Sequence, residues 1–181
     1  MPLLQRAIGV LCLIAVAPAI ALLSLLVLLS LGRPVFFVQN RSGLNQQTFG
    51  LIKLRSMTNE RGPCGELLPD EQRVTRLGRW LRRTRLDELP GFLNVARGEI
   101  ALIGPRPLLP DTIEAMGREG KIRATVPPGM TGWSQVNGNT LLSNLQKLEL
   151  DIWYIENRSL GVDLQILWRT LLVVLRGEKL T

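Results

Sequence analysis

The feature that most constrains this chain is an uncharged, apolar stretch that begins after Arg6 and ends before Arg33. Leu, Ala, Ile and Val dominate residues 7–32, and no acidic or basic side chain interrupts them. About 20 apolar residues already span the hydrocarbon core of a bilayer as a helix, so this stretch is long enough for insertion. We therefore expect a membrane-inserted segment at residues 1–33, followed by a cytosolic domain at residues 34–181.

Pro18 lies near the middle of this stretch. Because proline removes a backbone hydrogen bond and clashes with the preceding turn, it predicts two helical halves that meet at a bend. The basic flanks Arg6 and Arg33 lie at opposite ends, whereas a spanning helix usually gathers them on the cytoplasmic side. A re-entrant hairpin with both ends at the cytoplasmic face is therefore favoured. A kinked span stays open, and a cleaved signal peptide is disfavoured because apolar residues continue to Leu31.

The rest of the chain is basic and contains no histidine. Lys and Arg number 22 against 15 Asp and Glu, and the net charge of +7 favours anionic partners such as nucleic acid, lipid headgroups or nucleotides. Without histidine, any catalytic acid, base or nucleophile must be a carboxylate, hydroxyl, thiol or lysine. Cys12 and Cys64 lack metal-ligand spacing and are poorly placed to pair, which indicates a reducing, cytoplasmic setting.

Two adjacent carboxylates, Asp87 and Glu88, lie in an arginine-rich segment that ends at Pro90. Proline fits the first turn of a helix, so the pair is expected at the N-terminus of a helix that runs to about Val95. The helix dipole and the nearby arginines would then keep Asp87 ionised, as a nucleophile or metal ligand. An ordinary helix start is the simpler explanation of these residues alone, because the dipole favours acids there.

Around this pair, the hydrophobic pattern predicts an α+β fold that is mostly helical. The predicted elements are a β-hairpin at 35–39 and 48–54, an exposed loop at 58–71, a strongly basic amphipathic helix at 73–83, a short buried strand or turn at 100–103, and helices at 143–156 and 163–176. The last helix is almost filled with apolar residues. It suits the membrane interface and the protein core equally well.

Two rigid turns carry candidate anion-binding groups. In the first, Pro105 and Pro107 flank Arg106, and a guanidinium held in place loses less entropy when it binds a phosphate or carboxylate. In the second, Gly129 and Gly132 would let backbone amides approach a ligand closely. For the first turn, a purely structural role is an equally good explanation.

Taken together, these segments resemble the bacterial sugar transferases, and specifically the small monotopic phosphoglycosyl transferases that act on polyprenyl phosphate. The resemblance covers essentially the whole chain in order. Besides the proline-broken apolar stretch it rests on five co-linear motifs, Gln39–Gly43, Lys53–Met57, Leu86–Pro90, Gly104–Pro107 and Pro128–Trp133. Each motif alone is weak evidence, but five in order are specific.

The resemblance implies transfer of a phospho-sugar from a UDP-sugar to a polyprenyl phosphate such as undecaprenyl phosphate, which releases UMP. This is the first step of glycoconjugate assembly, for a glycoprotein, O-antigen or exopolysaccharide, at the cytoplasmic face of the bacterial inner membrane. Asp87 would be the covalent nucleophile and a ligand of Mg²⁺, and Glu88 would assist with the metal or the acceptor's proton. Membrane lipid and later glycosyltransferases are the further partners implied.

The same resemblance implies a set of substrate-binding residues whose cations relieve the repulsion between a carboxylate and a diphosphate. The set is Lys53, Arg55, Arg82, Pro105, Arg106, Pro107, Gly129, Thr131, Gly132 and Asp163. Two positions depart from the family pattern. Ala17 precedes Pro18 where a serine is common, and Asn139 follows Gly138 where relatives often carry an arginine. If that arginine contacts the sugar or its phosphate, the donor preference differs here.

Two other functions stay open. A membrane-anchored basic module that binds nucleic acid or anionic lipid would show salt-sensitive binding and indifference to substitution of Asp87. Nucleic acid is not an expected partner, because the chain lacks the interleaved aromatic residues of stacking platforms and its carboxylates would repel a phosphate backbone. The second is an inactive scaffold that retains the fold, and only an activity assay distinguishes it from an enzyme.

Overall fold

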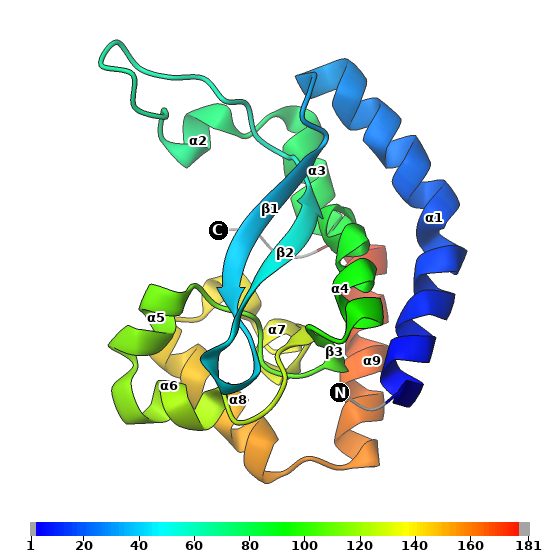
Figure 1. Cartoon of the computed structure of the whole chain (residues 1–181), viewed down its shortest axis with the longest axis vertical. Coiled ribbons are helices and arrows are strands. Elements are labelled where there is room, and N and C mark those ends of the chain that lie inside the picture. Colours follow the sequence, from blue (N-terminus) through cyan, green and yellow to red (C-terminus); the bar gives the residue numbers. More distant parts are fainter. Residues whose placement is uncertain (1–2, 178–181) are drawn as a thin grey trace.

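The apolar stretch at the N-terminus forms one long helix, α1, over Leu3–Leu31 in the computed structural model, which describes residues 3–177. Residues 178–181 of the expected cytosolic domain lie outside the described residues. Pro18 lies inside α1 without dividing it, so the two halves that were expected to meet at a bend form one continuous helix. Instead, the helix follows a curved path along one side of the molecule (Figure 1).

Both halves of α1 pack against the rest of the protein. In the first half, a Cβ atom at Gly9 would lie 2.7 Å from the amide nitrogen of Ala96, so the glycine permits close contact with helix α4, Phe92–Arg97. In the second half, Leu23 and Val27 are buried in a cluster with Leu54 and Leu81. The helix is therefore attached to one body at both ends.

The opposite face of α1 is apolar and exposed. In the most apolar segment of the helix the mean hydropathy is 2.9, and 11% of this segment is buried. The helix is long and apolar enough to cross a membrane. Its exposed apolar side chains are Leu3, Leu4, Val10, Leu11, Ile14, Leu22, Leu25, Leu26, Leu28 and Leu29. Such a surface is stable only when lipid or protein covers it.

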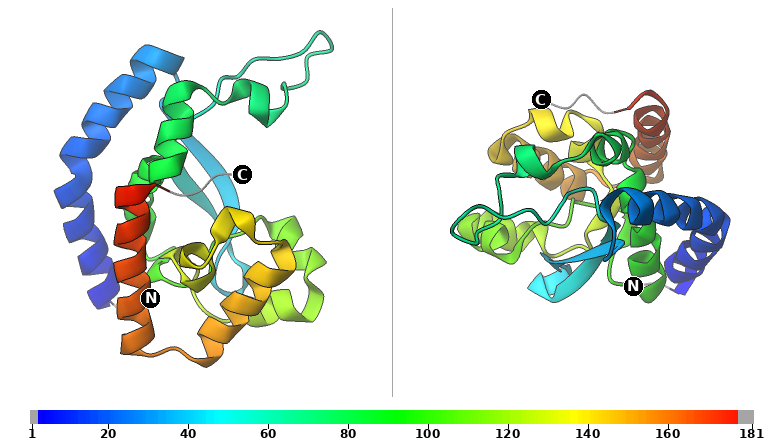
Figure 2. Two further views of the ribbon diagram at one scale, coloured as in Figure 1. Left: turned by 180° about the vertical axis from the view of Figure 1, so that it is seen from behind. Right: turned by 90° about the horizontal axis from the view of Figure 1, so that it is seen from above.

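A two-stranded antiparallel hairpin follows α1. Strand β1, Phe36–Ser42, pairs along its whole length with strand β2, Thr48–Leu54, around the short 3₁₀ helix η1, Leu44–Gln46. The predicted hairpin is therefore confirmed, although β1 begins one residue later and ends three residues later than expected. The hairpin lies between α1 and the group formed by α5, α6, α7 and α8 (Figure 2).

The segment after the hairpin contains the predicted loop and basic helix. Residues 58–69 project away from the body, and they lead into the short helix α2, Asp70–Arg73, and then α3, Arg76–Thr84 (Figure 1). The Oγ1 atom of Thr75 caps α3 by accepting a hydrogen bond from the Gly78 amide at 3.0 Å. The basic helix thus starts three residues later than predicted, because Val74 interrupts the helical conformation.

A second sheet joins two segments that are distant in sequence. Strand β3, Ala101–Ile103, pairs in parallel with β4, Gly129–Thr131. The sequence predicted a short buried strand or turn where β3 lies, and a rigid, glycine-containing loop for the region that contains β4. A Cβ atom at Gly129 or Gly132 would lie 2.0 Å from backbone atoms of Gly104, so both glycines permit this close approach.

The remaining elements are helical. They are α5 (Pro110–Ala115), α6 (Gly117–Arg123), α7 (Trp133–Val136), the 3₁₀ helix η3 (Asn139–Leu141), α8 (Asn144–Glu156) and α9 (Leu160–Arg176). Helix α8 was predicted, and a capping box between Ser143 and Gln146 fixes its start. Helix α9 was also predicted, and it begins three residues earlier than expected. Its packing against α3 and α7 leaves a row of exposed apolar residues that includes Leu164 and Trp168.

The expectation of an α+β, helix-rich fold with small sheets is therefore confirmed. The re-entrant form of α1 and the interfacial position of α9 are not confirmed by the fold alone.

Candidate active site

The two adjacent carboxylates lie in the first turn of η2, a 3₁₀ helix over Leu86–Gly91 that continues into α4. Arg85 adopts a left-handed conformation with φ of 56°, which ends α3 and turns the chain into η2. The sequence correctly predicted a helix start that includes Pro90. As a result, Asp87 and Glu88 face the hairpin with little exposure to solvent, and Asp87 is 7% exposed.

Glu88 is held by two cations. The Nζ atom of Lys53 donates a hydrogen bond to Oε1 of Glu88 at 2.6 Å, and Nη2 of Arg106 donates to the same oxygen at 2.9 Å. Burial alone would raise the pKa of Glu88, but Arg106 and Lys53 together hold this pKa below its usual range. Glu88 is therefore ionised, and its carboxylate is already engaged.

Asp87 is in the opposite situation. Within residues 3–177, its carboxylate forms no hydrogen bond or ion pair with another side chain. Burial, followed by the charge of Glu88, raises the pKa of Asp87 to about 6, against the opposing effect of nearby cations. This corrects the expectation that the dipole and the arginines would favour the ionised form. The reason is that Lys53 and Arg106 pair with Glu88, while Asp87 itself is desolvated.

Arg82 approaches from the last turn of α3. Its Nε atom donates a hydrogen bond to Oγ of Ser56 at 2.9 Å, and its Nη2 atom lies 2.9 Å from the sulfur of Met57. A Cβ atom at Gly78 would lie 1.8 Å from the carbonyl oxygen of Ser56, so only glycine lets α3 pass this close. The guanidinium of Arg82 is thus positioned beside Asp87.

Arg106 is fixed through its main chain by a buried ionic network. Nη2 of Arg123 donates a hydrogen bond to the carbonyl oxygen of Arg106, and Nε of Arg123 donates to Oδ2 of Asp151 at 2.7 Å. Oγ of Ser134 donates to Oδ1 of Asp151 at 2.7 Å. Arg123, Ser134 and Asp151 are each at most 4% exposed. The network therefore holds the turn that presents Arg106 to Glu88.

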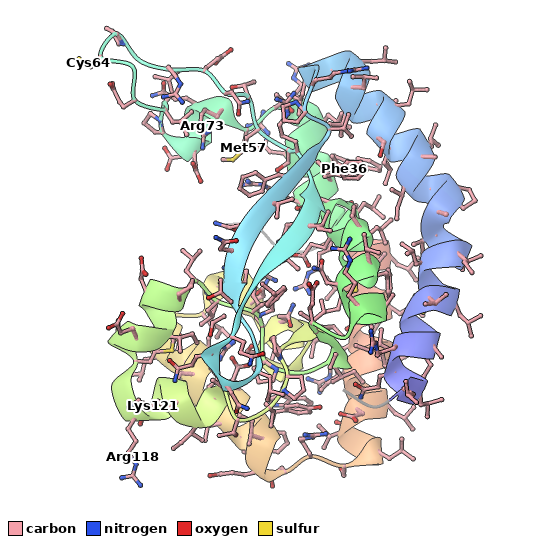
Figure 3. The ribbon with its side chains drawn as sticks, in the orientation of Figure 1. Phe36, Met57, Cys64, Arg73, Arg118 and Lys121 are labelled. Carbon is pink, nitrogen blue, oxygen red and sulfur yellow. The ribbon has the colours of Figure 1, made fainter. Side chains whose placement is uncertain are left out.

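A large cavity opens beside Asp87, and we call it the main cavity. Its volume is roughly 1550 Å³ with the open solvent at its mouth included. Only three acids line it, against seven basic side chains, Arg41, Lys53, Arg55, Arg73, Arg82, Arg85 and Arg106. Figure 3 shows Arg73 on α2 and Met57 between α2 and the hairpin. This excess of cations suits a ligand with several negative charges, such as a diphosphate.

A smaller space adjoins the main cavity, and we call it the side pocket. Its volume is roughly 370 Å³, again with open solvent included. The two spaces share Arg41, Lys53, Glu88 and Arg106 in their walls. The other residues of the side pocket are Leu51, Ile52, Gly91, Ile100, Pro107, Gly129, Met130 and Gln135. Glu88 and its two cations thus stand between the two spaces.

The structure gathers most of the predicted site residues. Those that line the main cavity or the side pocket are Lys53, Arg55, Arg82, Asp87, Glu88, Arg106, Pro107 and Gly129. Arg55 also has a clear structural contact, because its guanidinium donates hydrogen bonds to the carbonyl oxygens of Leu31, Gly32 and Arg33. It therefore joins the end of α1 to the cavity wall.

Four predicted residues lie outside these two spaces. Pro105 is fully buried, and Gly132 packs against the backbone of Gly104. Oγ1 of Thr131 lies 2.6 Å from Oγ1 of Thr170 on α9, and Oδ1 of Asp163 accepts a hydrogen bond from the Tyr154 hydroxyl at 2.8 Å. The structure therefore gives these residues packing and hydrogen-bonding roles instead of a place beside Asp87.

Sequence reasoning missed Arg41 as a member of the site. Nη2 of Arg41 donates to Oε1 of Gln39 at 2.5 Å, and Nη1 donates to the carbonyl oxygen of Pro107 at 3.3 Å. Phe37, Gln39 and Arg41 alternate along β1 and all line the main cavity, as does Lys53, the cross-strand neighbour of Phe37. The alternation in the Gln39–Gly43 motif was the signal that could have identified Arg41.

The donor groups around Asp87 fit a magnesium ion that is held mainly by a substrate. Among residues 3–177, no group of three or more acidic, histidine or cysteine side chains could hold a metal alone. Because Glu88 is engaged by two cations, Asp87 is the carboxylate available. Magnesium in such sites usually takes one or two carboxylates together with substrate phosphates. The expectation of Mg²⁺ stays a prediction.

A buried carboxylate without a cation partner, in a cation-lined cavity beside an apolar helix, suits a membrane-associated enzyme that acts on phosphorylated substrates. The family model described as bacterial sugar transferase matches residues 2–177. The uncharacterized sugar transferase EpsL of Bacillus subtilis is 48% identical over 150 residues, which cover 83% of this chain and 74% of the relative.

Two longer relatives carry more specific names. The undecaprenyl-phosphate glucose phosphotransferase of Komagataeibacter xylinus is 39% identical over 178 residues, 90% of this chain and 33% of the relative. The UDP-glucose:undecaprenyl-phosphate glucose-1-phosphate transferase of Escherichia coli is 36% identical over 183 residues, 93% of this chain and 39% of the relative. The chain belongs to the bacterial sugar transferase family. The expectation of an enzyme of the phosphoglycosyl transferase class is thereby confirmed.

Proposed function

We propose that this protein transfers a sugar phosphate from a UDP-sugar to undecaprenyl phosphate, with Asp87 as the covalent nucleophile. One observation carries the proposal. Asp87 is a buried carboxylate without a cation partner among the described residues, and it lies in the wall of a cavity with seven basic side chains. The carboxylate is therefore available to react, and the cavity suits the diphosphate it would react with.

In the first step, an oxygen of the Asp87 carboxylate attacks the β-phosphorus of the UDP-sugar. A new bond forms between this oxygen and the phosphorus, and the bond from the phosphorus to the bridging oxygen breaks. UMP leaves with the electron pair, and the sugar phosphate stays on Asp87 as a mixed anhydride. Arg82 and Lys53 offset the negative charge that approaches the carboxylate. A bound Mg²⁺ would supply further charge neutralisation for the leaving UMP.

In the second step, a phosphate oxygen of undecaprenyl phosphate attacks the same phosphorus. The bond to Asp87 breaks, the carboxylate is regenerated, and undecaprenyl-diphospho-sugar is released. Glu88 has its Oε1 atom occupied by Lys53 and Arg106, so we assign it the task of holding these two cations in place. This product is a lipid-linked sugar, and its formation is the first step of glycoconjugate assembly.

The packing of α1 supports a re-entrant membrane anchor. Gly9 contacts α4, and Val27 packs with Leu54 and Leu81, so both halves of the helix adhere to the same body. A spanning orientation would carry the hairpin and α4, which pack along the helix, into the roughly 30 Å of the hydrocarbon core, where their polar groups would lose their hydrogen bonds to water. We propose that the exposed faces of α1 and α9 contact lipid at the cytoplasmic face of the bacterial inner membrane.

The activity is tested with the full chain in nanodiscs that contain undecaprenyl phosphate and Mg²⁺. A panel of UDP-sugars is screened for UMP release, and we expect at least one donor to react. Asp87→Asn should lower the rate by at least about a thousandfold, because the nucleophile is lost. Without acceptor, mass spectrometry should detect a sugar phosphate on the peptide that contains Asp87. Absence of UMP with every donor, or full activity of Asp87→Asn, contradicts the proposal.

The anchor is tested by labelling from one side of the membrane. Cys12 and Cys64 are first replaced by serine, and then Gln5→Cys or Arg33→Cys is introduced at either end of α1. An impermeant maleimide added to inside-out vesicles should label both positions. Labelling of only one position would show that the helix spans the bilayer.

A further inference from the structure

One aromatic side chain in the wall of the main cavity has an uncovered ring. Phe37 on β1 lines this cavity and is 48% exposed. Within residues 3–177, its ring forms no stacked or cation–π contact with another side chain. Exposed aromatic faces bind planar groups, and stacking of a nucleobase on such a ring adds substantially to affinity. Phe37 therefore suits a flat ligand group that enters the main cavity.

The next side chain on the same face of β1 is an amide with a fixed orientation. Gln39 also lines the main cavity, and Nη2 of Arg41 donates a hydrogen bond to its Oε1 atom at 2.5 Å. Because a guanidinium has donors but no acceptor, Oε1 is the atom of the amide that must face Arg41. The Nε2 atom has no hydrogen-bond partner in the described part of the chain. Gln39 therefore offers a hydrogen-bond donor beside the ring of Phe37.

The register of the hairpin relates this ring to the two carboxylates. Lys53 is the cross-strand neighbour of Phe37, and its Nζ atom reaches Oε1 of Glu88 at 2.6 Å. In a UDP-sugar, one ribose separates the base from the α-phosphate, and Asp87 attacks the β-phosphorus in the proposed reaction. A base stacked on Phe37 therefore lets the ribose and the phosphates extend along Lys53 toward Asp87.

The side of the hairpin on which Phe37 lies favours a water-soluble ligand over a lipid chain. The opposite face carries Phe36, whose cross-strand neighbour Leu54 packs on the second half of α1. The face with Phe37 lines the main cavity, whose other walls include Met57 and residues of α2. The hairpin lies between α1 and α2 (Figure 1). Phe37 therefore faces away from the apolar helix that suits contact with lipid.

We propose that Phe37 and Gln39 bind the uracil base of the nucleotide donor, an inference that rests on the proposed function. The base stacks on the ring of Phe37, and Nε2 of Gln39 donates a hydrogen bond to the carbonyl oxygen at C4 of the base. Cytosine carries an amino group at C4, which is itself a donor. Since two donors cannot form a hydrogen bond, Gln39 selects uridine over cytidine nucleotides.

The stacking is tested by binding, so that the result does not depend on turnover. The full chain in nanodiscs with Mg²⁺ is titrated calorimetrically with UDP and with pyrophosphate, which lacks the base and the ribose. The wild type should bind UDP at least about tenfold more tightly than pyrophosphate. Phe37→Leu should weaken UDP binding about tenfold and leave pyrophosphate binding unchanged, which also shows that the variant is folded.

Phe36→Leu is the matched control. Phe36 is 45% exposed and precedes Phe37 on the same strand, but it does not line the main cavity. This variant should bind UDP and pyrophosphate as the wild type does. An equal loss of UDP affinity in both variants would show a general effect on the hairpin and overturn the inference.

The hydrogen bond is tested by discrimination between bases. The wild type should bind UDP about tenfold more tightly than CDP. Gln39→Leu removes the donor and should bring the ratio of the two affinities close to one. Because both affinities are measured on the same variant, any general weakening of diphosphate binding cancels in the ratio. Equal binding of UDP and CDP by the wild type, or an unchanged ratio in Gln39→Leu, overturns the inference.

The outcomes separate this inference from the proposed function. Unchanged UDP affinity in Phe37→Leu, with a raised KM for undecaprenyl phosphate, would assign Phe37 to the lipid and overturn the inference. Release of UMP from a UDP-sugar, with UDP and pyrophosphate bound equally, also overturns it, while the proposed function stands. A preference for UDP that depends on Phe37 and Gln39, without UMP release from any donor, supports the base site and contradicts the transfer reaction. Absence of binding by both UDP and pyrophosphate contradicts both.

Discussion

Glu88 binds the two cations that its neighbour Asp87 lacks, although both carboxylates lie in the same turn of η2. The charge of Glu88 adds to the effect of burial and raises the pKa of Asp87 to about 6. One residue of the pair is therefore a fixed anion that organises Lys53 and Arg106. The other keeps a carboxylate that is desolvated and accessible from the main cavity, which is the condition a nucleophile requires.

The raised pKa of Asp87 predicts how the rate depends on pH. Attack requires the ionised carboxylate, so kcat/KM should fall about tenfold per pH unit below about 6 and level off above it. Glu88→Gln removes the neighbouring negative charge, and it should shift the midpoint of this acid limb to lower pH while reducing the maximal rate. The profiles are measured for UMP release between pH 5 and 8. A midpoint that does not move in Glu88→Gln contradicts this account.

Asp87 should also reduce the stability of the folded protein. Its pKa is near 3.8 in an unfolded chain and about 6 in the fold, so the folded state loses stability as the pH rises between these values. At pH 7.5 the loss is on the order of 2–3 kcal/mol. Asp87→Asn removes the buried charge and should raise the unfolding midpoint while it abolishes activity. The measurement is thermal unfolding in detergent, and convergence of the two proteins near pH 4 is the control.

The sequence was sufficient for the elements with strong local signals. The helical pattern after Ser143, the strand residues at 48–54 and the dense apolar run at 163–176 are each signals between residues close in sequence, so local patterns located α8, β2 and α9. The unbroken course of α1 was not predictable in the same way. Pro18 removes one backbone hydrogen bond from α1. The half before Pro18 packs on α4, and the half after it packs on Leu54 and Leu81, so these tertiary contacts hold both halves in one helix.

The sequence predicted which residues belong to the candidate site, but not which carboxylate pairs with which cations. Sequence motifs correctly brought Asp87, Glu88, Lys53 and Arg106 together, whereas the choice of Glu88 as the partner of both cations depends on how η2 faces β2. The sequence also contained no sign of the buried network that holds the main chain of Arg106, for a similar reason. Its residues lie on α6, α7 and α8, and no local pattern relates Arg123 to Asp151.

Arg55 should contribute to stability through the end of α1. Its guanidinium donates hydrogen bonds to three successive carbonyl oxygens, that of Leu31 at the end of α1 and those of Gly32 and Arg33 just beyond it. Arg55→Ala should lower the free energy of unfolding by roughly 2–3 kcal/mol, and Arg55→Lys should recover only part of this loss. Chemical denaturation in detergent measures the effect. A variant that raises KM for the UDP-sugar without loss of stability would instead support the substrate-binding role predicted from the sequence.

The buried network behind Arg106 should affect both stability and turnover. Burial raises the pKa of Asp151, whereas the charge of Arg123 and the hydrogen bond from Ser134 lower it. The ionised form of Asp151, and with it the ion pair to Arg123, therefore depends on both partners. Asp151→Asn leaves the charge of Arg123 buried without a counter-charge, which should cost about 3–5 kcal/mol. Tyr154→Phe is the control, since it removes a hydrogen bond from the same helix without touching this network.

The effect on turnover should pass through Arg106. Because Arg123 holds the carbonyl oxygen of Arg106, a loosened turn lets the side chain leave Glu88, and kcat should fall between about tenfold and a hundredfold. In an Arg106→Ala background, Asp151→Asn should have little further effect on kcat, because the group that it positions is already absent. Hydrogen exchange of the backbone at residues 104–108 should rise in Asp151→Asn and stay low in Tyr154→Phe. Independent, multiplicative losses of kcat in the double variant would show that the network supports the fold alone.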